Sequence, residues 1–522
     1  MHRHHVTLGL LRSEPPPMKR LPDQNRRGRA RWNALLILLL AACIARLWLM
    51  SLSSSFWTDE TETVFIVQHP ADPSLVEARV PTSLYYALPR AAGRLFGFSE
   101  RSWRFPSVLM MGIALFVIGR LAARLIDPDA AWFAIFACFI MPDFNYYAID
   151  ARPYALGICV TAASLWFLIE WLDTARHGEG SWKSALLFVF FAALLWRVQL
   201  IFWGFYPVFL IYALFRLARS TTRVGWLRAV SVFSLLAVAL IPVAFEALRI
   251  LQNAQEHVFA PLPPFRSLLH YVPWKPLAFC AGLPWLAGNF LKWSRKGALS
   301  PDAMTLVAAW WLWMPLCLFG YSRLTGTVLF APRYFSPSLP GAALAATALA
   351  AIYLPRPLWK QSAVVLAIVG LLWTGRWSVL WPTHSPDNWR QGAVEEALAA
   401  RESDTPVIAI SPFIEARSPV WSPHYALPGF LYTPLFVYPV RGRIYPFPFS
   451  LSPDVEQYGA RLVRDTLSKR ARFIVYGGGR NAIGWAAWFS RRPELAGWSY
   501  TVHPAEAIET VVFENPASGR SR

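Results

Sequence analysis

The chain has 522 residues, of which 55% are hydrophobic, 15% are aromatic and only 16% are charged, whereas about 25% of the residues of an average soluble protein are charged. Together with a mean hydropathy of +0.34, this composition excludes a disordered chain, argues against an ordinary soluble enzyme and indicates many membrane-spanning segments. The net charge of +19, from 50 Lys and Arg against 31 Asp and Glu, fits nucleic acid, anionic lipid or a topology signal. The positions of the charges decide between these.

The first residues and the cysteines narrow the class of protein. Residues 1–32 are basic and are predicted to form a cytoplasmic tail, and an apolar run from Ala34 to Ala45 follows them. This order is also typical of a cleaved signal peptide, but the long apolar stretch, the lack of an A-x-A site after it and the many later spans favour a retained first span. The cysteines lie in apolar runs without CxxC spacing, which argues against a zinc site or a disulfide framework; they are Cys43, Cys138, Cys159, Cys280 and Cys317.

Long apolar segments recur as far as residue 380. A helix needs about 20 apolar residues to cross the hydrocarbon layer of a bilayer. We therefore predict an all-α polytopic membrane domain over residues 33–380, with about eleven transmembrane helices. The predicted spans are 33–51, 103–124, 130–147, 154–172, 184–196, 199–215, 229–248, 276–290, 304–321, 336–354 and 362–380.

Alternate short connections between these spans are rich in Arg and Lys. By the positive-inside rule they lie in the cytoplasm, together with the N-terminus. The net charge is then largely a topology signal, and since no nucleic-acid-binding motif accompanies it, we expect no nucleic-acid partner. The basic connections contain Arg120 and Arg124; Arg176 and Lys183; Arg216, Arg219, Arg223 and Arg228; Lys292, Arg295 and Lys296; and Arg356 and Lys360.

The opposite connections face outside, including a first outer loop over residues 52–102. Within this loop, residues 84–96 have apolar side chains at helical spacing, which predicts an interfacial helix that Pro89 would kink or split. Residues 381–522 contain no run of span length. They are predicted to form a small α/β domain on the outer face, with strands at 406–410, 472–476 and 509–513 and a helix at 388–401.

Acidic residues near the predicted membrane boundaries are few. Asp59, Glu60 and Glu62 follow the first span directly, and they are either solvated loop acids that mark the outer side or part of a site. Asp150 lies in a very short outer loop between two spans. It either pairs with Arg152 and caps the next helix or contributes to the same site.

Arg333 places a cation at the outer end of a late span, in the sequence Ala331-Pro332-Arg333-Tyr334-Phe335. An Arg at this depth can extend its guanidinium to the phospholipid headgroups. Its fork of donors is equally suited to the phosphate of a ligand.

Several short motifs together resemble one family. Their order and their topological side resemble the GT-C glycosyltransferases that use polyprenyl-phosphate sugars, the group that contains protein O-mannosyltransferases and the lipid A aminoarabinose and galacturonic acid transferases. The resemblance extends from Phe56 to about Ile410. The motifs are Trp57-Thr58-Asp59-Glu60, Leu84-Tyr85-Tyr86, Ser102-Trp103-Arg104-Phe105-Pro106, Asp150-Ala151-Arg152-Pro153-Tyr154, Arg333-Tyr334-Phe335 with Pro340-Gly341, and Asp387-Asn388-Trp389-Arg390.

The resemblance implies a GT-C-like membrane protein of the bacterial inner membrane, with its C-terminal α/β domain in the periplasm. It implies transfer of a sugar from a polyprenyl-monophosphate donor to an envelope acceptor, which is a glycolipid such as lipid A, a glycan or a protein. The expected partners are this donor, this acceptor and the membrane lipids.

The same resemblance assigns roles to individual residues. Asp59 would orient or deprotonate the acceptor, Glu60 would support it, and Asp150 would be the second acid of the site. Arg333 would hold the donor phosphate and Arg152 would orient Asp150.

Further site residues follow from how this chain matches or departs from the family pattern. Tyr85 is a candidate substrate-binding residue by the resemblance. The family often has His-Pro-Pro or Lys-Pro-Pro before Leu-Tyr-Tyr, whereas this chain has Pro81-Thr82-Ser83, so Arg79 is the candidate replacement for a phosphate contact. Asp150 stands where Glu is commoner, which shortens the reach of the carboxylate.

The chemistry of the residues agrees with this assignment. A lipid phosphate is already a good leaving group, so the reaction needs a base and a cation more than a strong acid, and Asp59 and Arg333 supply these. In-line attack would invert the anomeric carbon. Two carboxylates in one outer cavity can also bind a divalent metal ion, although the sequence shows no more complete ligand set.

Two other functions stay open at this point. A transporter or flippase of lipid-linked or anionic solutes predicts charged residues at mid-bilayer depth and broken helices, but Arg46, Glu170, Arg197 and Glu246 lie toward the ends of the predicted spans. A membrane-anchored scaffold predicts that the outer acids can be replaced without loss of function.

Overall fold

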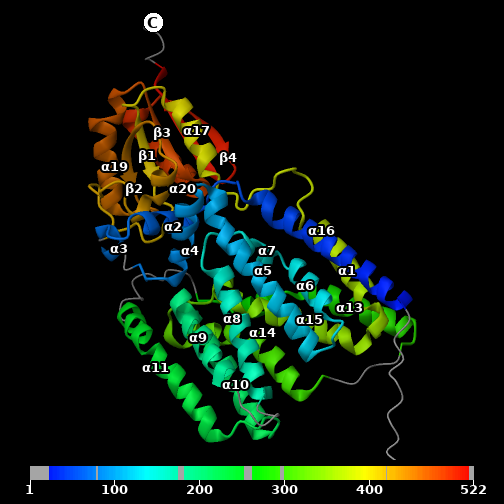
Figure 1. Ribbon diagram of the computed structural model, residues 1–522. Helices are drawn as coiled ribbons and strands as arrows, with labels where there is room; N and C mark the ends of the chain where they lie inside the picture. The colour runs from blue at the N-terminus through cyan, green and yellow to red at the C-terminus, as the bar shows by residue number, and fades with distance from the viewer. Residues whose placement is uncertain are drawn as a thin grey trace, which may run out of the picture.

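The computed structural model describes residues 23–77, 80–174, 182–251, 262–293, 299–418 and 420–516. In Figure 1 a large helical part is capped at one end by a small region that contains a β-sheet. The helices are α1 (Asp23–Cys43), α2 (Thr58–Gln68), α3 (Pro73–Glu77), α4 (Ala87–Phe96), α5 (Glu100–Leu125), α6 (Ala131–Phe139), α7 (Pro142–Ala148), α8 (Tyr154–Thr174), α9 (Trp182–Val198), α10 (Tyr206–Ala218), α11 (Trp226–Leu251), α12 (Arg266–Tyr271), α13 (Trp274–Phe290), α14 (Pro301–Thr325), α15 (Leu339–Tyr353), α16 (Trp359–Thr374), α17 (Trp389–Ala400), α18 (Thr433–Val437), α19 (Pro453–Asp465) and α20 (Gly479–Ser490).

Within the described residues, eight helical segments are long and apolar enough to cross a membrane. The predicted all-α polytopic architecture is therefore confirmed, while the number of eleven spans stays a prediction. These segments are Ala30–Ser51, Glu100–Leu125, Tyr154–Thr174, Leu200–Ala218, Trp226–Leu248, Pro301–Thr325, Pro332–Tyr353 and Arg356–Thr374.

The other three predicted spans form shorter helices. Helices α9 and α13 have 17 residues each. The span predicted over 130–147 is divided into α6 and α7, because Pro142 at the start of α7 has no N–H with which to continue the hydrogen bonds of α6. The last span also ends earlier than predicted, at Thr374 instead of residue 380.

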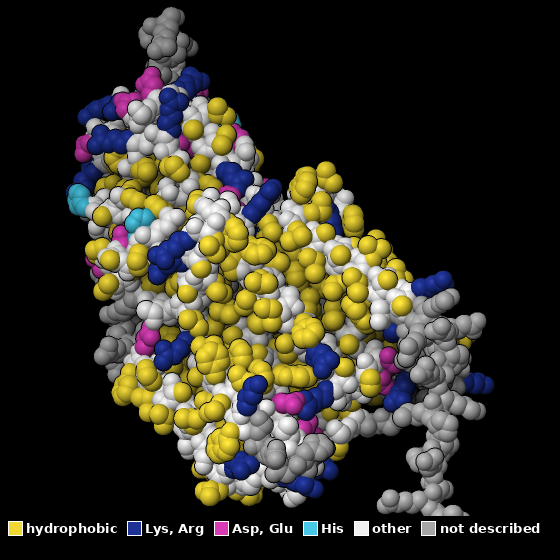
Figure 2. All heavy atoms as spheres, viewed as in Figure 1, with side chains coloured by type: hydrophobic (Ala, Val, Ile, Leu, Met, Phe, Trp, Pro, Cys, Tyr) yellow, Lys and Arg dark blue, Asp and Glu magenta, His cyan; other side chains and the backbone are white. Residues whose placement is uncertain are grey.

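The surface of the helical part is apolar. Figure 2 shows a continuous field of hydrophobic side chains across this part, whereas charged side chains gather over the sheet region and at the opposite end. Many large apolar side chains of the long helices are exposed, such as Phe116 on α5 and Leu227 and Phe245 on α11. Such an extended apolar surface is expected for a protein whose helices face lipid.

Ion pairs gather at the end of the helical part that is far from the sheet. Arg124, in the last turn of α5, lies 2.9 Å from Asp173, and Arg216, on α10, lies 2.9 Å from the same carboxylate. Arg356 pairs with Asp127 at 3.0 Å. These arginines belong to the basic connections that the sequence places on one side of the membrane, and the structure places them at one end.

The C-terminal region contains a five-stranded mixed sheet in the order β2-β1-β3-β5-β4. Strand β1 (Pro406–Ile410) runs parallel to β2 (Arg443–Phe447) and β3 (Arg472–Gly478), and β5 (Ile508–Glu514) runs antiparallel to β3 and β4 (Ser499–Ala505). The sheet and the helices around it confirm the predicted small α/β fold of this region.

The sheet region and the first outer loop share one hydrophobic core. Buried Phe56, Val64 and Phe65 belong to the same cluster as Trp389 and the strands of the sheet. Figure 1 accordingly shows α2, α3 and α4 between the sheet and the long helices. Residues 84–96 form a short 3-10 turn over Leu84–Tyr86 followed by α4, and Pro89 lies in the first turn of α4, so it does not split that helix.

Candidate functional site

The first turn of α2 carries two of the predicted site residues, Asp59 and Glu60. Trp57 is the residue before the helix, and its backbone N–H donates to the Glu60 carboxylate at 3.2 Å, the usual role of an acid at the third helical position. Thr58 is held from the other side, because its hydroxyl donates to Asp387 at 2.9 Å. The segment after the last span therefore fixes the start of α2.

Glu60 is fully buried and each of its oxygens accepts two hydrogen bonds. Arg104, which is also fully buried on α5, donates from Nε at 2.7 Å and from Nη2, and the backbone N–H of Ala151 donates at 2.8 Å. The remaining donors of Arg104 reach carbonyls of the first outer loop, those of Leu52, Ser54 and Ser55. Glu60 thus ties together α2, α5 and the Asp150 loop, and it is placed to position other residues rather than to touch a substrate.

Asp59 and Arg333 form the open part of the site. Nη1 of Arg333 donates to Oδ2 of Asp59 at 2.7 Å, across 274 positions of sequence. The Arg333 side chain is 43% exposed and that of Asp59 is 17% exposed. The sequence placed both residues on the outer side, and the structure brings them into direct contact.

Arg152 turns toward α2. Its Nη1 donates to the backbone carbonyl of Asp59 at 3.0 Å and to Glu62 at 3.1 Å, and its Nη2 lies 3.9 Å from the Asp59 carboxylate. Burial raises the pKa of Glu62, and the charge of Arg152 opposes that rise. The expectation that Arg152 orients Asp150 is therefore not what the contacts show, because Arg152 organises the acids of α2.

Asp150 lies behind this open part and is fully buried. Its Oδ1 accepts a hydrogen bond from Nε1 of Trp57 at 3.0 Å and lies 3.6 Å from Nε2 of His384, which is also buried. Burial raises the pKa of Asp150 to about 7, and burial lowers the pKa of His384 to about 3. His384 is therefore neutral at physiological pH.

Tyr85 does not reach the open site in the described structure. Tyr85 is fully buried, and its hydroxyl lies 3.4 Å from that of Ser107, which donates to the backbone carbonyl of Asp150 at 2.6 Å. Burial also raises the pKa of Tyr85. Arg79 lies outside the described residues.

Two cavities meet at Tyr146. One, of about 360 Å³, is lined by Arg333 and by aromatic rings, those of Trp57, Tyr146, Tyr147 and Tyr154. The other, of about 410 Å³, lies between α7 and the segment after α16, and its lining includes Tyr146, His384 and Arg376. Tyr146 lines both cavities, and its ring stacks on His384 at a centroid distance of 4.2 Å.

Sequence reasoning missed three residues that shape the site, namely Arg104, His384 and Asp387. Arg104 and Asp387 lie in motifs that carried the family resemblance, and a lone Arg in an apolar span is a signal of a buried ion pair. His384 is an isolated His in a connection, and nothing in the linear sequence relates it to Asp150.

Comparison with known proteins identifies the fold. Residues 82–244 match the family model described as dolichyl-phosphate-mannose-protein mannosyltransferase, a segment that includes Asp150 and Arg152 but neither Asp59 nor Arg333. The structure is similar to the crystal structure of ArnT from Cupriavidus metallidurans in the apo state, with a TM-score of 0.53 and 13% identity, over 93% of this chain and 98% of that chain. The chain has a GT-C fold. The GT-C resemblance of the sequence motifs is thus confirmed at the level of the fold.

A second structure was also compared with this GT-C chain. ArnT from Cupriavidus metallidurans bound to undecaprenyl phosphate gives a TM-score of 0.49 and 12% identity, with the same coverage of 93% and 98%. None of the curated protein sequences compared with the chain matches it.

Proposed function

We propose that the protein is a multi-pass membrane glycosyltransferase that moves a sugar from a polyprenyl-monophosphate donor to a glycolipid, glycan or protein of the cell envelope. The observation that carries this proposal is the contact between Arg333 and Asp59 beside an aromatic cavity. It puts a cation suited to a phosphate next to a carboxylate suited to an acceptor hydroxyl. The GT-C fold and the family matched by residues 82–244 support the same class of reaction.

Donor binding would release the Asp59 carboxylate, the proposed base, from Arg333. Arg333 is bound to Asp59, and Arg152 lies 3.9 Å from the same carboxylate oxygen. A lipid phosphate in the cavity competes for the exposed Arg333 guanidinium through charge-assisted hydrogen bonds. The Asp59 carboxylate then loses its strongest partner and becomes free to accept a proton.

The transfer itself is a single displacement. The acceptor oxygen bonds to the anomeric carbon while its proton passes to the Asp59 carboxylate, and the bond from that carbon to the phosphate oxygen breaks. The electron pair goes to the phosphate, whose growing charge Arg333 stabilises. Attack opposite the leaving phosphate inverts the anomeric carbon.

Substitution of Asp59 and Arg333 tests these two roles. Membranes with Asp59→Asn should transfer labelled sugar from polyprenyl-phosphate donors at least about 100-fold more slowly than wild type, the usual range for loss of a general base. Asp59→Asn should bind polyprenyl phosphate at least as tightly as wild type, because Arg333 no longer has a carboxylate partner. Arg333→Gln should weaken that binding by roughly 10- to 100-fold, the equivalent of one charge-assisted hydrogen bond.

Asp143→Asn is the matched control, since Asp143 is an exposed carboxylate that lines the second cavity. It should transfer sugar and bind donor as the wild type does, with all variants inserted equally. Wild-type transfer by Asp59→Asn would contradict the catalytic assignment.

A transporter or flippase is the alternative function, and a second experiment separates it from the proposed transferase. Among the described residues, the buried cations Arg46, Arg104 and Arg216 bind oxygens of the protein itself, so their donors are already used. Movement of a labelled lipid across a vesicle membrane, without transfer of sugar by the wild type, would favour transport.

A further inference from the structure

A cluster of buried polar atoms without partners lies behind the open site. Oδ2 of Asp150 and both ring nitrogens of His384 accept or donate no hydrogen bond. The two side chains are 0% and 1% exposed. Since buried polar atoms nearly always have a partner, three such atoms on two neighbouring residues call for an explanation, and a bound ligand supplies one.

The geometry of the cluster suits a metal ion. Glu60, Asp150 and His384 each offer one ligand atom, and these atoms lie within 4.8 Å of one another. Both oxygens of Glu60 already accept hydrogen bonds, from Arg104, Trp57 and Ala151. The atoms that are free to coordinate therefore belong to Asp150 and His384.

The charges of the site point the same way. Each guanidinium of the site is bound to an acid other than Asp150, because Arg104 pairs with Glu60, Arg152 with Glu62 and Arg333 with Asp59. Asp150 has no such partner among the described arginines and lysines, and the basic side chain within 4 Å of its carboxylate is that of His384, at 3.6 Å. A cation at this position would complete the pairing of charges.

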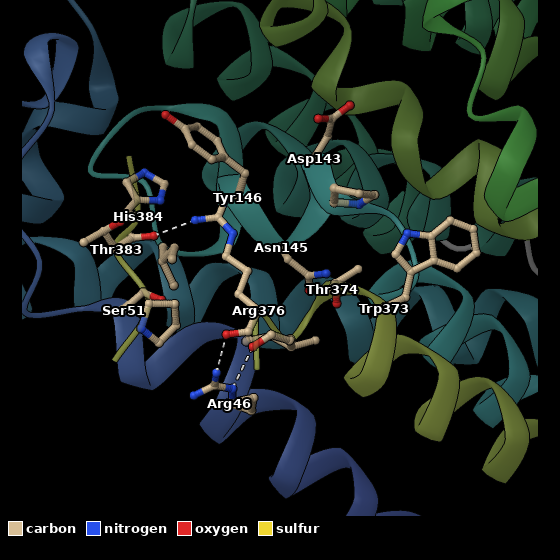
Figure 3. Close-up of a pocket in the computed structure, with 15 residues that line it drawn as sticks. Arg46, Ser51, Asp143, Asn145, Tyr146, Trp373, Thr374, Arg376, Thr383 and His384 are labelled. Atoms are coloured by element: carbon tan, nitrogen blue, oxygen red, sulfur yellow. Dashed lines mark hydrogen bonds between the residues drawn. The ribbon is translucent and has the colours of Figure 1, made fainter. Parts of the chain in front are cut away.

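The site borders the second cavity and is held in place. Figure 3 shows His384 and Tyr146 at one wall of the second cavity, and the Arg376 side chain reaching toward Thr383. The backbone N–H of His384 donates to Ser54 at 3.0 Å. Arg46 donates to the four carbonyls that precede this segment, those of Gly375, Arg376, Val379 and Leu380. The His384 side of the cluster therefore borders the second cavity.

We propose that Asp150 and His384 bind a divalent transition-metal ion, with Glu60 in the surrounding hydrogen-bonded shell and the open coordination positions facing the second cavity. An imidazole with a carboxylate suits zinc and similar ions, whereas magnesium and calcium prefer oxygen ligands alone. The site adjoins the proposed transfer centre, but its metal content is measured without any transfer reaction, so the two proposals fail separately.

The test is metal binding by the full-length protein without an affinity tag, stripped with a chelator and titrated with Zn²⁺ and with Co²⁺. We expect one tight equivalent of Zn²⁺, visible d–d absorption with Co²⁺ and no displacement by Mg²⁺. His384→Gln and Asp150→Asn should each weaken that equivalent by on the order of 100-fold, at the upper end of the range measured even for outer-shell ligand partners. His2, His4 and His5 can also bind Zn²⁺. The proposed site is therefore defined by the equivalent of Zn²⁺ that the wild type binds tightly and the His384→Gln and Asp150→Asn variants bind weakly.

The control variants are His69→Gln and Asp143→Asn. His69 has a ring nitrogen without a partner but packs against Phe65 and Phe436, and Asp143 is a carboxylate on the wall of the same cavity. Both should bind Zn²⁺ as the wild type does. His384→Cys should keep the ion and add the near-ultraviolet charge-transfer band of a Co²⁺–thiolate bond, which a structural role of His384 would not produce.

Equal Zn²⁺ affinity and stoichiometry in wild type and His384→Gln would overturn the proposal. A His384→Cys protein that elutes as the wild type in gel filtration but lacks the thiolate band with Co²⁺ would overturn it as well.

Discussion

Arg104 and Glu60 form a charged pair in a place where neither charge can reach water. Both side chains are 0% exposed, and every donor of Arg104 that is hydrogen-bonded reaches a carboxylate, a carbonyl or a hydroxyl. Removing one member of a buried pair leaves the other charge without compensation, which costs about 3–5 kcal/mol. Arg104→Gln should therefore lower the thermal stability of the detergent-solubilised protein strongly.

The control for this prediction is Arg124→Gln. Arg124 pairs with Glu170 and Asp173, but the three side chains are about a quarter to a third exposed, and such pairs contribute about 0–1 kcal/mol. The double variant Arg104→Gln/Glu60→Gln should recover part of the loss. Equal melting temperatures for Arg104→Gln and Arg124→Gln would contradict the role given to the buried pair.

Residue identities predicted part of the site. Their position at membrane boundaries singled out Asp59 and Arg333, because charged residues are rare there and a topological side can be read from neighbouring charges. Their roles came from the family resemblance and stay predictions. The partner of Arg152 and the burial of Glu60 were not predictable. Both depend on the direction in which a side chain leaves a short loop or a helix turn, and tertiary contacts fix that direction.

At the scale of elements, the sequence predicted strands β1, β3 and β5 but not β2 and β4. The first three are runs of apolar residues buried in the sheet, so the sequence predicted them. Strand β4 is exposed over most of its length, and β2 contains Pro446 and lies at an edge of the sheet. Edge strands lack the buried apolar pattern by which strands are predicted.

Gly341 controls how closely α15 approaches α14. A Cβ atom at this position would lie 2.6 Å from the backbone nitrogen of Trp311 and 2.7 Å from the carbonyl carbon of Trp310. Gly341→Ala must push the two helices apart, and overpacking of this kind costs about 1–3 kcal/mol. We expect a lower melting temperature and, because Arg333 lies just before α15, slower sugar transfer.

Gly320→Ala is the matched change on α14 itself. A Cβ atom at Gly320 would meet no other atom within 4 Å, and Ala is favoured over Gly inside a helix by about 1 kcal/mol. The melting temperature of this variant should equal or exceed that of the wild type. A Gly341→Ala protein as stable as Gly320→Ala would show that α15 can move away from α14 without cost.

At the scale of the whole molecule, the site lies where two separately packed parts meet. The long helices have one hydrophobic core, and α2 shares a second core with the sheet. Asp59 on α2 therefore belongs to the sheet side, while Arg333 precedes a long helix of the other part. The pair of residues proposed to act on donor and acceptor depends on both parts, which explains why neither part alone contains the site.

The arrangement also fixes which face of the membrane the site occupies, once one end of the molecule is located. We propose that the sheet region lies in the periplasm and the basic connections in the cytoplasm, since the basic connections lie at the end opposite the sheet.

Glu494→Cys, in the sheet region, and Arg223→Cys, in the connection between α10 and α11, place thiols at exposed positions of the two ends. The native cysteines add little background, because four are buried and Cys317 is partly buried. In cells with a permeable outer membrane, a membrane-impermeant maleimide should label Glu494→Cys at once and Arg223→Cys only after the inner membrane is opened. The reverse pattern would put Asp59 and Arg333 on the cytoplasmic face and contradict transfer to an acceptor of the periplasmic side.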